Sequence, residues 1–218
     1  MTTGFPHPPP AARALIDRLT ADDPDLAGIE AAAGPLPWRQ RPAGFPGLLQ
    51  AIVAQQISNQ AASAIWRRLS AVPGALTPEG LLALDEDTLR GAGLSRPKVA
   101  HSNALATAFA DGTLATERLA DLGDDAAIAA ICAVRGLGPW TAEVYLLFAQ
   151  QRPDVFPAGD VALAGAAADI KRLPTRPDTK ALRVLAERWR PARSLAARLL
   201  WHHWRHLTGR PAMDDLPV

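Results

Sequence analysis

The chain contains only one cysteine, Cys132, among its 218 residues. A single thiol excludes an internal disulfide framework, and it excludes an iron–sulfur cluster or a zinc site built from several cysteines. No apolar run reaches the roughly 18 residues that a membrane-spanning helix needs. The N-terminal residues MTTGFPHPPP lack the charged-then-apolar layout of a signal peptide. These absences predict a cytoplasmic protein with no membrane partner.

Strand patterns are also scarce, because no alternating apolar and polar run of useful length occurs. Apolar residues instead recur at helical spacing between frequent prolines and glycines, so we expect an all-α protein with about ten helices. Helices are predicted at 8–19, 45–69, 84–94, 96–109, 124–134, 140–150, 160–170, 178–188 and 191–207, with a short one after the cap Thr77-Pro78-Glu79. Residues 22–46 and 151–159 are predicted to be irregular connections.

The net charge of +1 hides an uneven distribution of charge. Residues 171–210 hold eleven Lys and Arg against two acidic residues, a net charge of +9, whereas residues 1–170 carry a net charge of −6. A basic segment of this kind indicates a polyanionic partner, most often nucleic acid. A well-solvated helical face is the alternative, and charge alone does not separate the two.

Two glycines one residue apart, Gly136 and Gly138, separate two of the predicted helices. They allow a tight hairpin, and Pro139 suits the first turn of the helix that follows. The free amides and the dipole at that helix start would bind a phosphate of a nucleic-acid backbone without reading bases. An ordinary turn between helices is the alternative reading of the same residues.

Asp160 follows Gly138 by 22 residues and stands at the start of another predicted helix. The helix dipole favours the ionised form of a carboxylate at this place. Most aspartates in this setting cap the helix, so the position alone does not decide between a structural and a catalytic role.

Taken together, these segments resemble a known family. The hairpin followed by Gly159-Asp160 is similar to the helix–hairpin–helix (HhH-GPD) superfamily of DNA glycosylases in base-excision repair. Residues 48–58 (LLQAIVAQQIS), Trp140-Thr141-Ala142 and Arg193-Ser194 resemble its 3-methyladenine DNA glycosylase II branch. The resemblance runs from about Phe45 to about Trp204.

The resemblance implies a two-lobed helical fold with the active-site cleft between the lobes. One lobe is expected at 48–157, with the hairpin; the other combines 1–47 with 158–218 and carries the catalytic carboxylate and the basic C-terminal helices. The residues before Phe45 are too few for the N-terminal β-rich domain of larger members. Double-stranded DNA with alkylated bases is the expected partner, bound by a monomer at the nucleoid.

The implied reaction is the removal of alkylated purines such as 3-methyladenine and 7-methylguanine by hydrolysis of the N-glycosidic bond. Asp160 takes the place of the family's catalytic carboxylate, and Asp154 is a weaker alternative. Trp140 stands where the strand-cutting branch has its lysine, and no lysine occurs between Lys98 and Lys171, so no lyase step is expected. A non-catalytic helix–hairpin–helix DNA-binding module and a helical protein-interaction domain remain the alternatives.

The resemblance also assigns binding residues. The base pocket is expected to include Trp140, Trp201, Phe45 and Tyr145; the wedge that fills the gap left by a flipped base is expected among Gln55, Gln56 and Ile57; and DNA phosphate is expected at Gly136, Gly138 and Thr141. No cofactor is required, but a structural Na⁺ or K⁺ is expected on the backbone carbonyls of Cys132, Val134 and Leu137. Two positions depart from the family pattern: Ala164-Gly165 replaces a basic residue, and Ala192 replaces an aromatic one.

Overall fold

The computed structural model describes residues 7–209, and over this range it contains helices and no strand. The all-α prediction is therefore confirmed. The chain folds as two compact units. The central unit runs from Arg41 to Gln150, and the terminal unit combines the chain up to Gln40 with the chain from Gln151.

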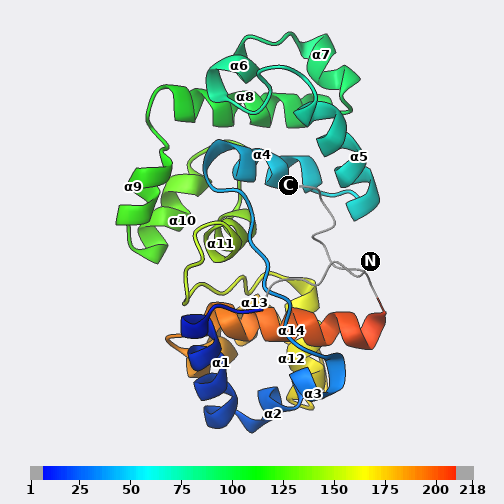
Figure 1. Ribbon diagram of the computed structural model, residues 1–218, viewed down its shortest axis with the longest axis vertical. Coiled ribbons are helices and arrows are strands. Elements are labelled where there is room, and N and C mark those ends of the chain that lie inside the picture. Colours follow the sequence, from blue (N-terminus) through cyan, green and yellow to red (C-terminus); the bar gives the residue numbers. More distant parts are fainter. Residues whose placement is uncertain (1–6, 210–218) are drawn as a thin grey trace. The chain divides into compact units, whose positions relative to one another are not determined.

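The terminal unit is built around its last helix, α14. α14 carries the buried residues Leu195, Ala196, Leu199 and Leu200, and helices α1, α3 and α12 pack against it (Figure 1). The helices of this unit are α1 (Pro10–Asp22), α2 (Pro24–Ala27), α3 (Ile29–Ala33), α12 (Val161–Ile170), α13 (Thr179–Ala186), the 3-10 helix η1 (Glu187–Trp189) and α14 (Arg193–Thr208).

The central unit is built around α4, whose residues Leu48, Leu49, Ile52 and Val53 are fully buried. Helices α5, α8 and α11 pack against α4, and α10 packs against α11 (Figure 1). Its helices are α4 (Gly44–Ala54), α5 (Asn59–Ser70), α6 (Pro78–Leu82), α7 (Glu86–Gly91), α8 (Arg96–Ala110), α9 (Thr116–Asp121), α10 (Asp124–Cys132) and α11 (Pro139–Phe148).

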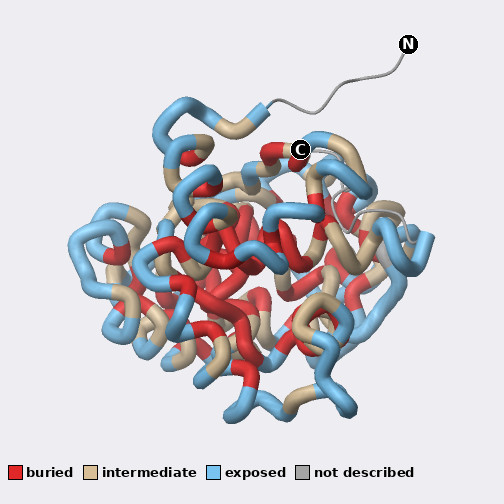
Figure 2. The backbone as a smooth tube through the Cα atoms, turned by 90° about the horizontal axis from the view of Figure 1, so that it is seen from below, coloured by how far each residue is buried: buried red, intermediate tan, exposed pale blue. Residues whose placement is uncertain are grey.

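Local signals place most helix ends correctly. The Thr77 side chain caps α6 by accepting the Gly80 amide hydrogen, and Asp178 caps α13 in the same way. Figure 2 shows buried and exposed stretches alternating along the chain, as expected for helices with one apolar face. None of the helices in the described range is long and apolar enough to cross a membrane.

Four features of the structure differ from the sequence predictions. The helix predicted at 45–69 is two helices, because the chain turns at residues 55–58 and Gln56 adopts φ +58°. The segment 22–46, predicted to be irregular, contains α2 and α3. Helix α9 was not predicted. The boundaries of the units lie seven residues before the predicted lobe boundaries at 48 and 157.

Candidate functional site

The hairpin (residues 133–138) joins α10 to α11 in the central unit. The Val134 carbonyl accepts a hydrogen bond from the Leu137 amide at 3.1 Å, which closes the turn. Gly136 has φ +92°, and a Cβ atom placed there would lie 2.2 Å from Cγ of His101, so this position requires glycine. Gly138 is the N-cap of α11, and a Cβ there would meet nothing within 4 Å. A side chain at Gly138 would therefore meet open space, whereas one at Gly136 would not.

Three further predicted residues of the central unit are buried. The Tyr145 hydroxyl accepts a hydrogen bond from the Gly44 amide at 2.8 Å, and Tyr145 itself is only 3% exposed. Phe45 packs edge-on against Phe109 with ring centroids 5.8 Å apart. Thr141 is buried as well, whereas Trp140 is half-buried at the start of α11. Tyr145 and Phe45 thus hold α4 against its neighbours, and their contact with a base stays a prediction.

The predicted wedge residues lie together in the turn between α4 and α5 but face different surroundings. The Gln55 side chain is half-buried and donates a hydrogen bond from Nε2 to the Gly136 carbonyl at 2.9 Å. Gln56 and Ile57 are exposed, Ile57 to 37%. The structure therefore brings one predicted wedge residue into contact with the hairpin and leaves two at the surface.

Asp160 is the N-cap of α12 in the terminal unit. Its Oδ1 accepts the amide hydrogens of Ala162 and Leu163 at 2.9 and 3.0 Å, and that of the Trp201 indole at 3.2 Å. The residue is only 9% exposed. Because three donors from two helices converge on one oxygen, the carboxylate is held in one orientation at a helix N-terminus.

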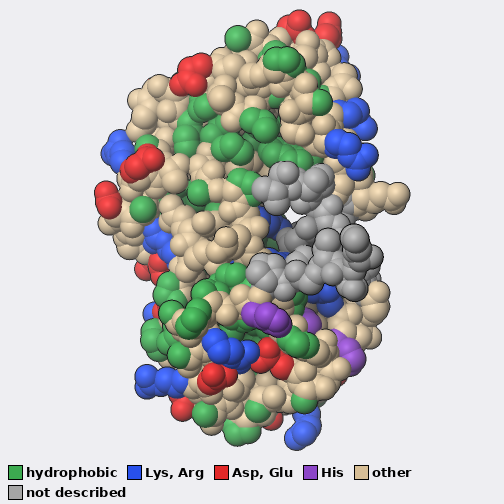
Figure 3. Space-filling view, viewed as in Figure 1, with side chains coloured by type: hydrophobic (Ala, Val, Ile, Leu, Met, Phe, Trp, Pro, Cys, Tyr) green, Lys and Arg blue, Asp and Glu red, His purple; other side chains and the backbone are tan. Residues whose placement is uncertain are grey.

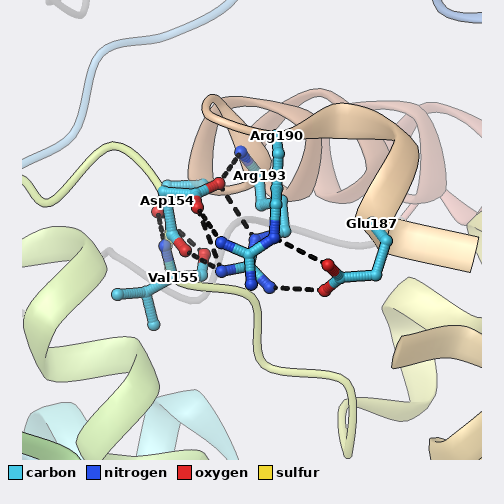
Figure 4. Close-up of polar contacts among 6 residues, drawn as sticks. Asp154, Val155, Glu187, Arg190 and Arg193 are labelled. Carbon is cyan, nitrogen blue, oxygen red and sulfur yellow. Dashed lines mark hydrogen bonds and ion pairs between the residues drawn. The ribbon is translucent and has the colours of Figure 1, made fainter. Parts of the chain in front are cut away.

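The alternative carboxylate, Asp154, is held in an ion-pair network in the same unit (Figure 4). Arg193 Nε lies 2.9 Å from its Oδ1 and Arg190 Nη1 lies 2.8 Å from its Oδ2. Glu187 binds both arginines from the other side. Two guanidinium groups already pair with this carboxylate, so Asp154 ties the loop to η1 and α14.

The loop before Asp160 is also tied to the start of α14. The Ser194 hydroxyl donates to the Val155 carbonyl at 2.8 Å and accepts from the Val155 amide at 2.9 Å. The Ser194 amide donates to the Pro153 carbonyl at 2.9 Å. Helix α14 thus fixes this loop through Ser194 and fixes the Asp160 carboxylate through Trp201.

Part of the basic charge at 171–209 is balanced inside the terminal unit. Lys171 binds Asp23 and Asp25, and Arg190 and Arg193 bind Asp154. The Arg198 guanidinium lies 4.3 Å from the ring centroid of Trp38. Figure 3 accordingly shows side chains of both charges on the displayed face. The exposed lysines and arginines in this range are Arg172, Arg176, Lys180, Arg183, Arg188 and Arg190, of which Arg190 is paired with Asp154, while Arg210 lies outside the described residues.

The departure at Ala164-Gly165 has a steric reason. A Cβ atom at Gly165 would lie 2.5 Å from the six-membered ring of Trp204, so any side chain there would displace the indole. Ala192 is buried directly before α14. The described residues contain no cluster of three or more His, Cys, Asp or Glu side chains that could hold a metal ion.

Residues 49–191 match the family model described as HhH-GPD superfamily base excision DNA repair protein. The chain belongs to this superfamily. The matched range includes the hairpin, the α4–α5 turn and Asp160.

Relatives of this HhH-GPD protein carry glycosylase names. DNA-3-methyladenine glycosylase 1 of Schizosaccharomyces pombe is 30% identical over 161 residues, which cover 72% of this chain and 71% of that protein. A Mycobacterium tuberculosis protein named "Probable bifunctional transcriptional activator/DNA repair enzyme AlkA" is 35% identical over 210 residues. That match covers 88% of this chain but only 40% of the longer relative.

Solved structures share the HhH-GPD fold over most of the chain. The S. pombe 3-methyladenine DNA glycosylase in complex with abasic DNA has a TM-score of 0.78 at 27% identity, covering 88% of this chain and 95% of that one. A DNA-3-methyladenine glycosidase from Bacillus halodurans has a TM-score of 0.77 at 28% identity, covering 90% and 96%.

Sequence reasoning missed two contacts of the HhH-GPD hairpin. His101 lies beneath Gly136, and Gln55 binds its carbonyl, although both come from helices distant in sequence. The two glycines of the motif signal a close approach, but no residue pattern says which side chain makes it.

Proposed function

We propose that this protein is a monofunctional DNA glycosylase that removes alkylated purines, such as 3-methyladenine and 7-methylguanine, from double-stranded DNA. The observation that carries the proposal is the Asp160 carboxylate, which the N-terminus of α12 and the Trp201 indole hold in a defined orientation. Membership of a base-excision repair superfamily and the names of the relatives support the same activity.

In the proposed reaction the damaged nucleotide is flipped out of the duplex. The alkylated purine carries a positive charge, so it leaves as a neutral base when the N-glycosidic bond breaks and takes both bonding electrons. The sugar left behind has oxocarbenium character. The negative charge of Asp160 stabilises this cation and orients the water whose oxygen bonds to C1′, with loss of one proton.

A cationic purine is attracted to the electron-rich face of an aromatic ring. Trp201 touches Asp160 through its indole N–H and is half-buried, so its ring offers such a face beside the carboxylate. We retain Trp140 as a further aromatic contact of the base, because its side chain is also half-buried rather than part of the core.

We further propose that the hairpin binds DNA phosphate through the amides at the start of α11, since Gly138 leaves this helix end uncovered. Backbone carbonyls of Cys132, Val134 and Leu137 would hold a Na⁺ or K⁺ ion there. The Val134 carbonyl oxygen accepts a hydrogen bond from the Leu137 amide. A carbonyl oxygen has a second lone pair, so this oxygen can also coordinate a Na⁺ or K⁺ ion. The cation would strengthen the attraction for phosphate.

The absence of a lyase step is part of the proposal, because Trp140 replaces the lysine of the strand-cutting branch. Borohydride treatment of a mixture with abasic DNA traps a Schiff base as a covalent complex. We expect no trapped complex; a covalent complex would contradict the monofunctional assignment. A single peak of monomer mass in gel filtration with light scattering is expected, and the nucleoid location stays a prediction.

The activity is tested by incubating the protein with methylated duplex DNA and measuring the free methylpurines released. Asp160→Asn keeps an oxygen that can cap α12 but removes the charge, so we expect a rate lower by a factor on the order of 100 or more. Asp178→Asn is the matched control, because Asp178 caps α13 in the same unit and has no proposed chemical role.

The competing hypothesis is a non-catalytic helix–hairpin–helix module, which predicts DNA binding without base release. No release by the wild-type protein would favour that module. Equal release by wild type and Asp160→Asn would leave a glycosylase but remove Asp160 from its chemistry.

A further inference from the structure

The turn between α4 and α5 (residues 55–58) is tied to the hairpin through one side chain. Gln55 Nε2 donates a hydrogen bond to the Gly136 carbonyl at 2.9 Å, across 81 residues of sequence. Both residues lie in the central unit. The contact joins the predicted wedge segment to the predicted phosphate-binding segment.

The backbone of this turn separates Gln55 from its neighbours. Gln55 ends α4 with φ −58° and ψ 131°, and Gln56 follows with φ +58°. Residues other than glycine rarely adopt a positive φ, so a surrounding structure must hold Gln56 there. As a result Gln55 lies against the hairpin, while Gln56 and Ile57 are exposed at the surface.

One face of α8 braces both segments. Lys98 Nζ donates a hydrogen bond to the Val53 carbonyl at the end of α4, at 2.7 Å. His101, three residues later on the same helix face, lies directly beneath Gly136 of the hairpin. The turn and the hairpin therefore both pack against α8, and the Gln55 side chain links them directly.

We propose that Gln55 is a positioning residue that couples phosphate binding at the hairpin to the placement of the wedge. In this arrangement Gln56 and Ile57 enter the space vacated by the flipped base, and Gln55 never leaves the Gly136 carbonyl. The inference rests on the proposed function, since it concerns how the same enzyme opens its duplex. It assigns Gln55 a role different from that of the exposed glutamine beside it.

The experiment uses two substrates and two variants of Gln55. One duplex carries 7-methylguanine for single-turnover excision, and another carries a tetrahydrofuran abasic analogue next to 2-aminopurine, whose fluorescence rises on unstacking. Gln55→Leu removes the hydrogen bond, and Gln55→Glu keeps the shape but loses the donor when ionised. Gln60→Leu and Gln60→Glu are matched controls, because Gln60 is exposed on α5 and the Gln60→Glu change measures the effect of added charge alone.

We expect Gln55→Leu to slow excision about tenfold. The 2-aminopurine fluorescence at saturating protein should fall to roughly half of the wild-type value. The affinity for undamaged duplex should change less than about threefold. For Gln55→Glu, the rate relative to wild type should rise as the pH falls from about 8 to about 4.5, close to the ordinary glutamate pKa of about 4.3, because a protonated carboxyl again donates to the Gly136 carbonyl. The recovery ties the effect to the hydrogen bond. A purely structural role of Gln55 would instead lower the melting temperature and the duplex affinity together with the rate, without a selective loss of the unstacking signal.

The inference is overturned if Gln55→Leu excises the base and raises the fluorescence as well as the wild-type protein does. It is also overturned if the excision rate of Gln55→Glu relative to wild type does not change with pH. The two proposals fail separately. If the wild-type protein releases no base but its unstacking signal still depends on Gln55, the proposed hydrolysis is wrong and the coupling holds. If Gln55→Leu melts at a lower temperature than wild type, the measurements are made at a temperature where both proteins are folded, and the unstacking signal at saturating protein still decides the question.

Discussion

The indole N–H of Trp201 donates a hydrogen bond to Oδ1 of Asp160 across 3.2 Å. Trp201 is on α14 and Asp160 caps α12, so two helices of the terminal unit set the orientation of one carboxylate. All three donors bind the same oxygen, two of them from the N-terminus of α12 and one from α14. The indole supplies a third direction, and this is why we treat Trp201 as an orienting group as well as an aromatic surface.

Trp201→Phe keeps an aromatic ring but removes the donor to Asp160. We expect kcat for methylpurine release to fall about fivefold, the equivalent of one hydrogen bond worth about 1 kcal/mol. KM should stay nearly constant, because the ring face remains. Single-turnover and steady-state measurements on methylated duplex separate the two parameters. A variant with raised KM and unchanged kcat would show that Trp201 only binds the base.

The two hairpin glycines should respond differently to alanine. Gly136→Ala forces a side chain into φ +92° and against His101, so we expect the free energy of unfolding to fall by about 1–3 kcal/mol. Gly138→Ala meets open space at φ −107° and should stay within about 0.5 kcal/mol of wild type. Chemical denaturation gives both values. Equal costs at the two positions would contradict the geometry of the hairpin.

Because position 138 tolerates a side chain, it can report on phosphate binding without unfolding the protein. Gly138→Asp places a carboxylate at the start of α11, and we expect duplex affinity at low salt to fall at least about tenfold. Gly138→Asn has the same shape without the charge and should bind much more tightly than Gly138→Asp. The difference should shrink as salt is added. Binding curves that coincide for the two variants at low salt would remove the hairpin from the DNA interface.

A buried ion pair predicts how stability depends on pH. Lys171 Nζ lies 2.6 Å from Oδ1 of Asp23, and the Trp189 indole donates to its Oδ2 at 2.8 Å. Burial opposes ionisation of Asp23, but the hydrogen bonds from Lys171 and Trp189 outweigh it and hold the pKa of Asp23 below its ordinary value. A carboxyl of this kind stabilises the fold above its unfolded pKa of about 3.9, and that contribution is lost as the pH falls through the folded pKa.

The corresponding variant is Asp23→Asn, which leaves the buried Lys171 with only the exposed Asp25. We expect the free energy of unfolding at neutral pH to fall by about 3 kcal/mol, and its dependence on pH below about 4 to become weaker. Asp25→Asn is the control and should cost less than about 1 kcal/mol, because the Asp25 side chain is 43% exposed. Wild-type stability that does not decrease on acidification from pH 5 would contradict a lowered pKa of Asp23.

Much of the fold follows from local signals in the sequence. Thr77, Asp178 and Gly138-Pro139 mark helix starts, since capping and proline placement depend on a few adjacent residues. The prediction at 45–69 failed for the opposite reason. Apolar spacing continues through Ile57 with no glycine or proline to mark a break, so the spacing hides the turn. The local signal is Ser58, which caps α5 by accepting the Ala61 amide hydrogen, and the contact of Gln55 with Gly136 comes from a distant segment.

The sequence by itself determined the helical class, most helix starts and the place of Asp160 at a helix N-terminus, because these depend on the residue and its near neighbours. The need for glycine at position 136 also depends on the distant residue His101. Tertiary structure alone decided the partners across the chain. Gln55 meets Gly136, Asp160 meets Trp201, and Asp23 meets Lys171 over separations of 81, 41 and 148 residues. Such contacts arise from packing of whole helices, which no local pattern encodes. The single cysteine excluded disulfide frameworks and cysteine-rich metal sites, and the scarcity of strand patterns indicated an all-α fold. The orientation of each functional side chain was decided by the tertiary structure.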